Sequence, residues 1–339
     1  MRLEMEMNDA HRSCSAVTET LALIIVIMIA TSSISFIIFW GVPYMEQEKE
    51  SVIAESALIQ FRTINDLIQE VSGKGVNGSS MIDFVAEKGN MFISSTGERF
   101  IFYYSLVDGF DFNVSGLDTD PCTQIFLTHS QAPPAPSPST ADIFYLNSGE
   151  RETALPLTTI DPRNAFCDTP NPLGDAVQVD IKDSVGTIIG RIWLFDPGSI
   201  YYELVATKGS YQMIAENGGV ISVQNQQRYL AYEPNIRKNG EVLFVPLIQL
   251  TSTSENVLAG DSAARTFLIK SNGTFVRESG ASVTTSFKCA IYGEHSSAWK
   301  NYFISQYKFI KEDGADILYH RAIKTFILTH STCEIAIVG

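Results

Sequence analysis

The sequence lacks the short motifs that identify the common enzyme classes. It contains no GxSxG nucleophile elbow, no Walker phosphate loop, no HExxH zinc motif, and no GxGxxG turn after a predicted strand. Its five histidines are scattered without metal-ligand spacing, and no two of its five cysteines have CxxC spacing. We therefore interpret the chain as a non-enzyme and expect no catalytic residue, no cofactor and no metal site.

Basic residues are outnumbered by acids. The chain has 24 Lys and Arg against 38 Asp and Glu, which gives a formal net charge of −14. No basic stripe with interleaved aromatic side chains is present, and this excludes nucleic acid as a partner. At 45% hydrophobic residues, the 339-residue chain is expected to fold, with room for one large domain or two ordinary ones beyond a hydrophobic segment.

Charged residues are also absent between Thr20 and Met45, where the chain is mostly apolar. About 20 helical residues span the hydrocarbon core of a bilayer, so this run is long enough to cross one. No small-residue cleavage site follows it, as a removable secretory signal would require. The run predicts a transmembrane helix.

The chain continues past Pro43 with a different pattern. Apolar residues recur at three- and four-residue steps, which indicates an amphipathic helix, and Ser72-Gly73 supplies a stop. The recurring positions are Ile53, Ala57, Phe61, Ile64, Ile68 and Val71. We expect one long helix over residues 16–72, kinked at Pro43.

Glu19 stands at the leading edge of the apolar run. One interpretation places it outside the lipid, as an ordinary interfacial residue. The other treats it as an assembly residue, because a carboxylate buried in a bundle of apolar helices needs a cationic partner. The free N-terminal amine of a neighbouring subunit is such a partner.

The stretch "CSAVTETLALIIVIMIA" resembles the N-terminus of archaeal type IV pilin-like proteins, the superfamily with class III signal peptides that includes the archaellins. Ala16-Val17-Thr18-Glu19 fits the small-residue patch and Ser/Thr-Glu pair that precede the apolar helix there. The resemblance continues through Gly41, Pro43 and the amphipathic segment. It also touches residues 213–250 and 296–303.

This resemblance implies a major or minor subunit of a type IV pilus-like surface filament. Residues 1–15 would be a leader or cytoplasmic segment, residues 16–72 would form the filament core as a homo-oligomer, and Glu19 would set the axial register. The membrane would hold the chain before assembly. The alternative is a non-polymerising, membrane-anchored adhesin or binding module with its C-terminal region outside. An anchored enzyme is the third interpretation, and it requires a cleft with paired acids or a metal.

The cysteines and the glycosylation sequons agree with an outer location for the later part of the chain. Four cysteines follow the apolar run, which is consistent with two disulfides in an oxidising compartment. Sequence proximity favours Cys122–Cys167 and Cys289–Cys333 among three possible pairings, and buried free thiols are the alternative. The candidate glycosylation sites are Asn77, Asn113 and Asn272.

After residue 73 the pattern changes to short alternating strands with turn signals. This predicts an α+β fold, a long N-terminal helix followed by a β-rich, sandwich-like extracellular domain over residues 73–339. We expect hairpins over residues 176–195, over 209–223 and at Asn272-Gly273, a helix over residues 296–312, and a last strand over residues 325–339. The proline-rich residues 131–140 are expected to form an exposed loop.

Residues 111–116 have the Asp-x-Asn-x-Ser-Gly spacing that opens a calcium loop. The twelfth position, where such a loop needs Glu, is Cys122. Phe112 and Val114 are typical strand residues, so we interpret this stretch as a strand end followed by an acidic turn.

Overall fold

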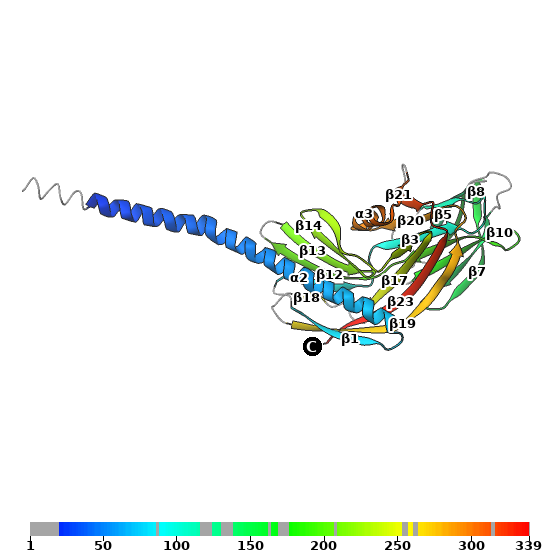
Figure 1. The fold of residues 1–339 in the computed structure, drawn as a ribbon, viewed down its shortest axis with the longest axis horizontal. Helices are drawn as coiled ribbons and strands as arrows, with labels where there is room; N and C mark the ends of the chain where they lie inside the picture. The colour runs from blue at the N-terminus through cyan, green and yellow to red at the C-terminus, as the bar shows by residue number, and fades with distance from the viewer. Residues whose placement is uncertain are drawn as a thin grey trace, which may run out of the picture. The chain divides into compact units, whose positions relative to one another are not determined.

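The computed structural model describes residues 20–85, 88–115, 124–129, 138–161, 164–168, 176–206, 209–252, 257–259, 264–312 and 316–338. The chain divides into two compact units, residues 1–53 with 206–208, and residues 54–205 with 209–339. The architecture is α+β, with one long apolar N-terminal helix followed by a β-rich domain (Figure 1). This confirms the predicted fold class.

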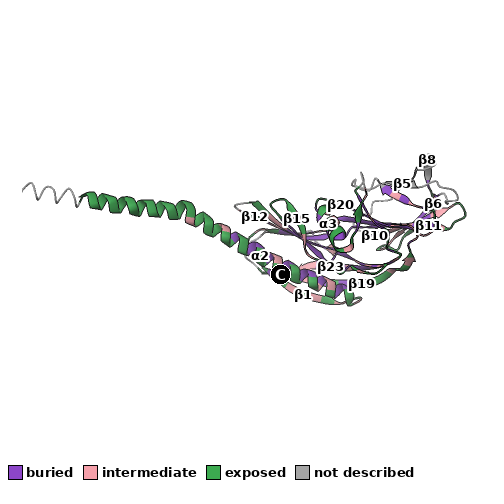
Figure 2. Ribbon diagram, turned by 45° about the horizontal axis from the view of Figure 1, so that its top comes forward, coloured by how far each residue is buried: buried purple, intermediate pink, exposed green. Residues whose placement is uncertain are grey.

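The N-terminal helix is continuous from Thr20 to Gly73. It contains one π-helical turn, η1 (Ile37–Gly41), followed directly by α2 (Val42–Gly73). Up to residue 49 its side chains are exposed or half-buried, and its last turns carry a buried stripe (Figure 2). The change from one pattern to the other follows the change in the sequence from an all-apolar run to an amphipathic repeat.

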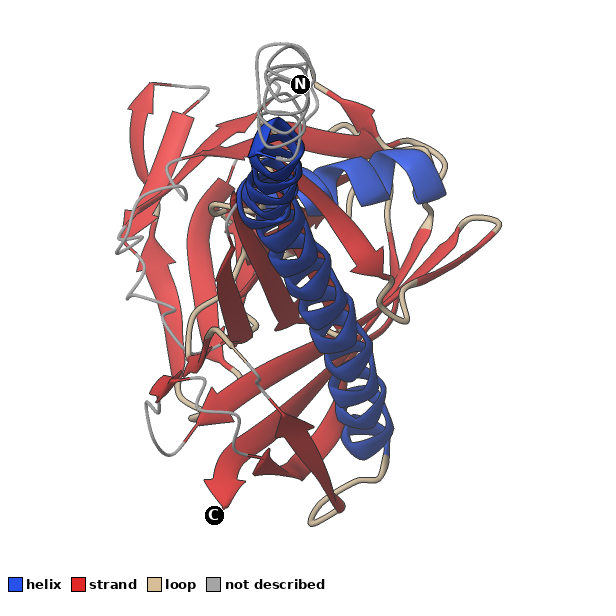
Figure 3. Ribbon diagram, turned by 90° about the vertical axis from the view of Figure 1, so that its left-hand side faces the viewer, coloured by secondary structure: helices blue, strands red, loops and turns tan. Residues whose placement is uncertain are grey.

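Within the second unit, the described strands form four sheets, and the strands predominate over helix (Figure 3). The five-stranded sheet has the order β1-β19-β23-β17-β16. Its strands are β1 (Ser79–Val85), β19 (Ala264–Ser282), β23 (Thr325–Val338), β17 (Val242–Ser252) and β16 (Arg237–Asn239). β17 and β23 are parallel, and the other neighbours in this sheet are antiparallel.

The eight-stranded sheet has the order β21-β22-β20-β3-β11-β10-β6-β7. Its strands are β21 (Ile310–Lys311), β22 (Ile317–His320), β20 (Phe287–Tyr292), β3 (Arg99–Ser105), β11 (Ile188–Phe195), β10 (Ala176–Asp183), β6 (Pro138–Tyr145) and β7 (Arg151–Pro156). The β10–β11 pair is the predicted hairpin over residues 176–195.

Two smaller sheets complete the unit. The six-stranded sheet runs β15 (Gln227–Tyr232), β14 (Gly219–Gln224), β13 (Gly209–Glu216), β12 (Ser199–Ala206), β2 (Asn90–Ser94) and β18 (Val257–Ala259). The four-stranded sheet runs β4 (Phe112–Ser115), β5 (Gln124–His129), β9 (Asn164–Asp168) and β8 (Thr158–Asp161). The β13–β14 pair confirms the hairpin predicted over residues 209–223, and β4 confirms the strand interpretation of residues 112–115.

Every residue of β3 is buried, so both faces of the eight-stranded sheet are covered at this strand. Phe100, Phe102 and Tyr104 point into one core cluster, which also holds buried side chains of β17, β23 and helix α3 (Ser296–Tyr307). Ile101 and Tyr103 point the other way, into a second cluster that includes Phe112 and Val114 of β4. Side chains on the two faces of β3 therefore pack into two different core clusters.

Helix α3 is shorter than predicted. Trp299, Tyr302 and Phe303 are buried, as their helical spacing indicated. The helix ends at Tyr307 because Lys308 adopts a left-handed conformation with φ of 62°. The chain then enters β21, which pairs with β22, so Ile310 belongs to a strand and not to the helix.

The predicted hairpin at Asn272-Gly273 is wrong. β19 runs through both residues as one 19-residue strand that pairs along its length with β23. The Asn-Gly pair sits at a register shift between Ser271 and Gly273, where φ of Gly273 is 122°. Glycine adopts positive φ readily, which suits a hairpin turn and also a β-bulge. Here it forms a bulge, because β23 pairs with β19 on both sides of Gly273.

The proline-rich segment also differs at its end from the expected loop. Pro138, Ser139 and Thr140 are the first residues of β6, and Pro138 is buried. Residues 131–137 lie outside the described residues. Proline is tolerated at the first position of a strand, where no ladder N–H is needed.

Candidate functional site

The apolar part of the long helix exposes its side chains on every side. Phe39 and Trp40 are 77% and 72% exposed, and the other large apolar residues between Leu21 and Met45 are 45–71% exposed. None of its most apolar 18-residue stretch is buried. Such a surface is unstable in water and needs lipid or other apolar helices around it. By length and composition this helix can cross a membrane, which suggests a membrane anchor before a globular C-terminal region.

Two hydroxyl groups in this stretch are compatible with an apolar environment. Thr31 Oγ1 donates a hydrogen bond to the carbonyl oxygen of Ile27 at 2.8 Å, and Ser33 Oγ donates to that of Ile29 at 2.8 Å. Because each hydroxyl is bonded within its own helix, it needs no partner from water.

Pro43 is the second residue after the π-helical turn. The N–H of Val42 donates to the carbonyl oxygen of Ile37, five residues back, instead of the usual four. Proline has no N–H to donate and its ring crowds the carbonyl of the residue four positions earlier, Phe39. A widened turn at this place relieves that crowding and keeps the helix continuous.

The last turns of α2 are fixed to the β-rich unit by both apolar and polar contacts. Phe61 and Ile64 are fully buried. Asn65 Nδ2 and Gln69 Nε2 both donate to the carbonyl oxygen of Gly218, at 2.9 and 2.6 Å. Gly218 lies in the turn between β13 and β14 with φ of 71°, a conformation that suits glycine.

A pocket of about 410 Å³ contains two acids that lie against each other. Glu98 and Glu216 are 4% and 1% exposed. The backbone N–H of Glu98 donates to Glu216 Oε2 at 2.9 Å, and Trp299 Nε1 donates to Glu216 Oε1 at 2.5 Å. The N–H of His295 donates to Glu98 Oε1 at 2.8 Å, whereas Glu98 Oε2 is buried without a hydrogen-bond partner.

Burial raises the pKa of both acids, that of Glu98 to about 7 and that of Glu216 to about 8. The negative charge of Glu98 raises the pKa of Glu216 further. Two carboxylic acids with raised pKa values in one pocket occur in acid–base sites and also in buried structural networks. No local pattern signals this pair, because its members are far apart in the chain and only the fold brings them together.

These acids predict a pH-dependent stability. Their folded-state pKa values lie above those of the unfolded chain, so between about pH 4.5 and 8 the folded protein binds more protons. The free energy of unfolding should therefore fall as the pH rises through this window. In Glu98→Gln the fall should be shallower, because the amide oxygen can still accept from His295 and carries no proton that is lost.

Denaturant midpoints measured from pH 5 to 8 check this prediction. Ser199→Ala removes an uncharged hydroxyl from the same pocket and should keep the slope of the parent protein. If the denaturant midpoint changes with pH equally in the parent protein and in Glu98→Gln, Glu98 is not a source of the pH dependence.

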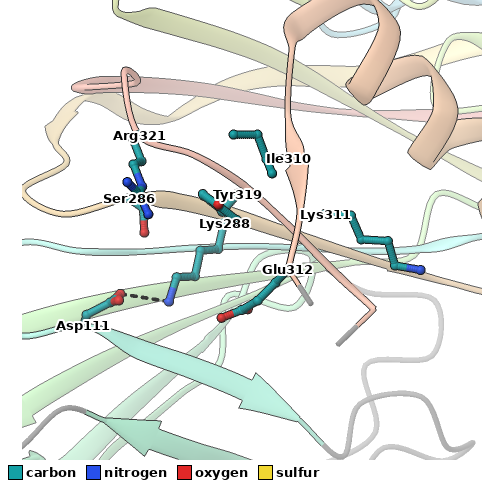
Figure 4. A pocket seen from close by; sticks show the side chains of 8 residues that line it. All are labelled: Asp111, Ser286, Lys288, Ile310, Lys311, Glu312, Tyr319 and Arg321. Atoms are coloured by element: carbon teal, nitrogen blue, oxygen red, sulfur yellow. Dashed lines mark ion pairs between the residues drawn. The ribbon is translucent and has the colours of Figure 1, made fainter. Parts of the chain in front are cut away.

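A second pocket, of about 440 Å³, lies where β20, β21 and β22 approach the start of β4 (Figure 4). Lys288 reaches into it from β20, and its side chain is only 6% exposed. Its Nζ lies 2.9 Å from Asp111 Oδ1 and donates to the carbonyl oxygen of Phe112 at 2.9 Å and to Asn113 Oδ1 at 2.6 Å. Glu312 Oε1 accepts from Asn113 Nδ2 at 3.3 Å. The pocket holds charges of both signs.

The predicted glycosylation sites differ in their surroundings. Asn77 and Asn272 are exposed, and the N–H of Asn77 donates to the carbonyl oxygen of Ser271 at 2.9 Å, so the two sequons lie close together. Asn113 is half-buried, and both ends of its amide are hydrogen-bonded, to Lys288 and to Glu312. A glycan on Asn113 would be attached to Nδ2, the same atom that donates to Glu312.

The predicted bridge between Cys289 and Cys333 is wrong. Both are buried free thiols. Cys289 lies on β20 of the eight-stranded sheet, and Cys333 on β23 of the five-stranded sheet. Burial raises the pKa of the Cys333 thiol to about 12 and raises the pKa of Cys289 as well. The alternative of buried thiols holds for these two cysteines.

For three other predicted residues the structure describes neither the side chain nor, in two cases, the backbone. Glu19 and Cys122 lie outside the described residues, and the side chain of Cys167 on β9 is not described. Within the ranges that the structure describes, no three His, Cys, Asp or Glu side chains gather to hold a metal ion.

Comparison with known proteins finds a family match for part of the chain. Residues 175–319 match a family of unknown function, DUF7289, and this stretch is less than half of the chain. The matched stretch includes Glu216, Lys288 and helix α3, and it excludes the long helix, Glu98 and Asn113. No curated protein and no solved structure matches the chain.

Proposed function

We propose that this chain is a structural subunit, major or minor, of an archaeal type IV pilus-like surface filament that assembles through its N-terminal helix. The observation that carries the proposal is the all-round exposure of apolar side chains from Leu21 to Met45. A surface of this kind suits lipid before assembly and neighbouring copies of the same helix after it. The N-terminal sequence pattern around Glu19 supports the same function.

The continuous helix supports this proposal in a second way. In a helical filament the apolar segments pack side by side in a core, so each must be long, uninterrupted and free of charge. The described helix has no Asp, Glu, Lys or Arg from Thr20 to Met45. Glu19 would then find its cationic partner on a neighbouring copy, and this pairing would set how far one subunit is shifted along the next.

A membrane-anchored binding module that never polymerises is the second candidate. The polar pocket that holds Glu98 and Glu216 favours it, because a structural subunit does not need such a pocket. In this case the apolar helix is a permanent anchor and the β-rich domain, placed outside the cell, carries the activity.

The N-terminal residue of the native protein distinguishes the two candidates. We expect mass spectrometry of a sheared cell-surface fraction to find a chain that begins between Ser13 and Ala16, because processing releases a subunit into a filament. Met1 retained on protein that stays in the membrane fraction would contradict the filament and support the anchored module.

The carboxylate of Glu19 provides the matching genetic test. Glu19→Ala should abolish filaments while the protein is still made, whereas Glu55→Ala, on the exposed face of α2, should leave them intact. Normal filaments without the Glu19 carboxylate would show that its role in register is wrong.

A further inference from the structure

The arrangement around Lys288 joins an amine to a carboxamide on a different sheet. Lys288 lies on β20 of the eight-stranded sheet, and Asn113 lies on β4 of the four-stranded sheet. The Nζ atom of Lys288 is 2.6 Å from Asn113 Oδ1, so the amine is in contact with the side-chain amide. The two residues are 175 positions apart in the sequence, and only the fold brings them together.

Two carboxylates flank this pair, one at each reacting group. Asp111 Oδ1 lies 2.9 Å from the Lys288 nitrogen. Glu312 Oε1 accepts a hydrogen bond from Asn113 Nδ2, and its second oxygen, Oε2, is buried without a partner. One acid is therefore placed to take a proton from the amine, and the other to deliver one to the amide nitrogen.

The surroundings hold the pair in place. Lys288 is 5% exposed, and its Nζ is also fixed by the carbonyl oxygen of Phe112. Phe112 is buried, and its ring lies 5.5 Å from that of Tyr103 and 5.2 Å from that of Phe110. Fixed neighbours of this kind can reach effective concentrations of about 10⁵ M or more, which lets an otherwise very slow reaction proceed.

We propose that Lys288 and Asn113 form an intramolecular isopeptide bond, assisted by Asp111 and Glu312. Asp111 accepts a proton from the Lys288 ammonium, and the freed lone pair on Nζ attacks Cγ of Asn113. The C=O electron pair moves to Oδ1 and then returns, so the bond from Cγ to Nδ2 breaks. Two of the three Nζ protons pass through the carboxylates to Nδ2, which leaves as ammonium, and one proton remains on the new amide.

No oxidant, cofactor or second substrate is needed, because the amine and the amide are both in the chain. The leaving group is small, and a pocket lined by Lys288 and Glu312 lies beside the pair (Figure 4). The bond would tie the four-stranded sheet to the eight-stranded sheet. It would be a covalent cross-link in a protein whose Cys289 and Cys333 form no disulfide with each other.

Mass spectrometry of the purified full-length protein tests the proposal. We expect an intact mass lower than the sequence mass by one ammonia molecule. After trypsin digestion, tandem spectra should show the peptides that carry Asn113 and Lys288 joined, with no cleavage after Lys288. Unjoined peptides, with or without a lost ammonia elsewhere, would overturn the proposal and leave an ordinary ion-pair cluster.

Variants distinguish formation of the amide bond from a non-covalent contact between the same side chains. Glu312→Gln should restore the full mass or slow the loss of ammonia at least tenfold, whereas Lys311→Ala, an exposed lysine of the same pocket, should keep the cross-link. Asn113→Asp gives a sharper test because the folded variant would form the same amide with loss of water. The joined peptides would then be lighter by one water relative to the sequence of that variant, and unjoined peptides from the folded variant would count against the mechanism.

Discussion

Replacement of both Ile29 and Ile34 by arginine should release the protein from the membrane fraction. The two side chains are 62% and 57% exposed and lie near the middle of the apolar stretch. Each arginine near the centre of a span costs about 2.5–3.5 kcal/mol by insertion scales. Together the two substitutions oppose insertion by about 5–7 kcal/mol on the same scales. Fractionation followed by an alkaline carbonate wash measures the result.

Val52 and Ile59 supply the matched control for this prediction. They are 63% and 56% exposed on the same helix, but they lie beyond Pro43 in the amphipathic part. The double replacement Val52→Arg with Ile59→Arg should leave the protein in the membrane fraction. If the Ile29 and Ile34 variant resists the carbonate wash as well as the parent protein does, the apolar stretch is not the anchor.

Phe61→Ala should destabilise the β-rich unit by about 3–5 kcal/mol, the range found when a buried phenylalanine is truncated. Phe61 is fully buried, and its ring lies 5.7 Å from that of Phe84 on β1 and 6.1 Å from that of Tyr202 on β12. It therefore fills the space where α2 meets two different sheets. Removing the ring leaves a cavity whose walls belong to three elements and cannot all move inward.

Denaturant unfolding of the full chain in detergent, followed by tryptophan fluorescence, measures this loss. Ile59→Ala, two residues away on the exposed face of the same helix, should change the free energy of unfolding by less than about 0.5 kcal/mol. A loss of less than about 1 kcal/mol in Phe61→Ala would mean that the end of α2 does not belong to the cooperative unit.

The long helix is the part of the fold that local patterns predict best. Its apolar run and its three- and four-residue repeat depend only on neighbours within a few turns, and the buried residues Phe61, Ile64 and Ile68 are those of the predicted stripe. The hairpin over residues 176–195 is of the same kind, since its two strands are joined by a short turn. Both are contacts between residues that are close in sequence.

The two wrong predictions were decided by contacts between residues that are far apart in sequence. Asn272-Gly273 has the backbone preference of a turn, but pairing with β23 on both sides of it decides that β19 continues straight through. Cys289 and Cys333 are close enough in sequence to pair, yet strand order places them in separate sheets. In each case the deciding partner is a distant strand, and no local pattern contains it.

Periodicity and turn chemistry act over a few residues, and they were enough to predict the α+β class, the apolar helix and the hairpins over residues 176–195 and 209–223. Which polar groups meet depends on contacts between distant parts of the chain. Glu98 reaches Glu216 across 118 positions, and Lys288 reaches Asn113 across 175. Such pairs depend on the order of strands in four sheets, which is set by the packing of whole faces against one another.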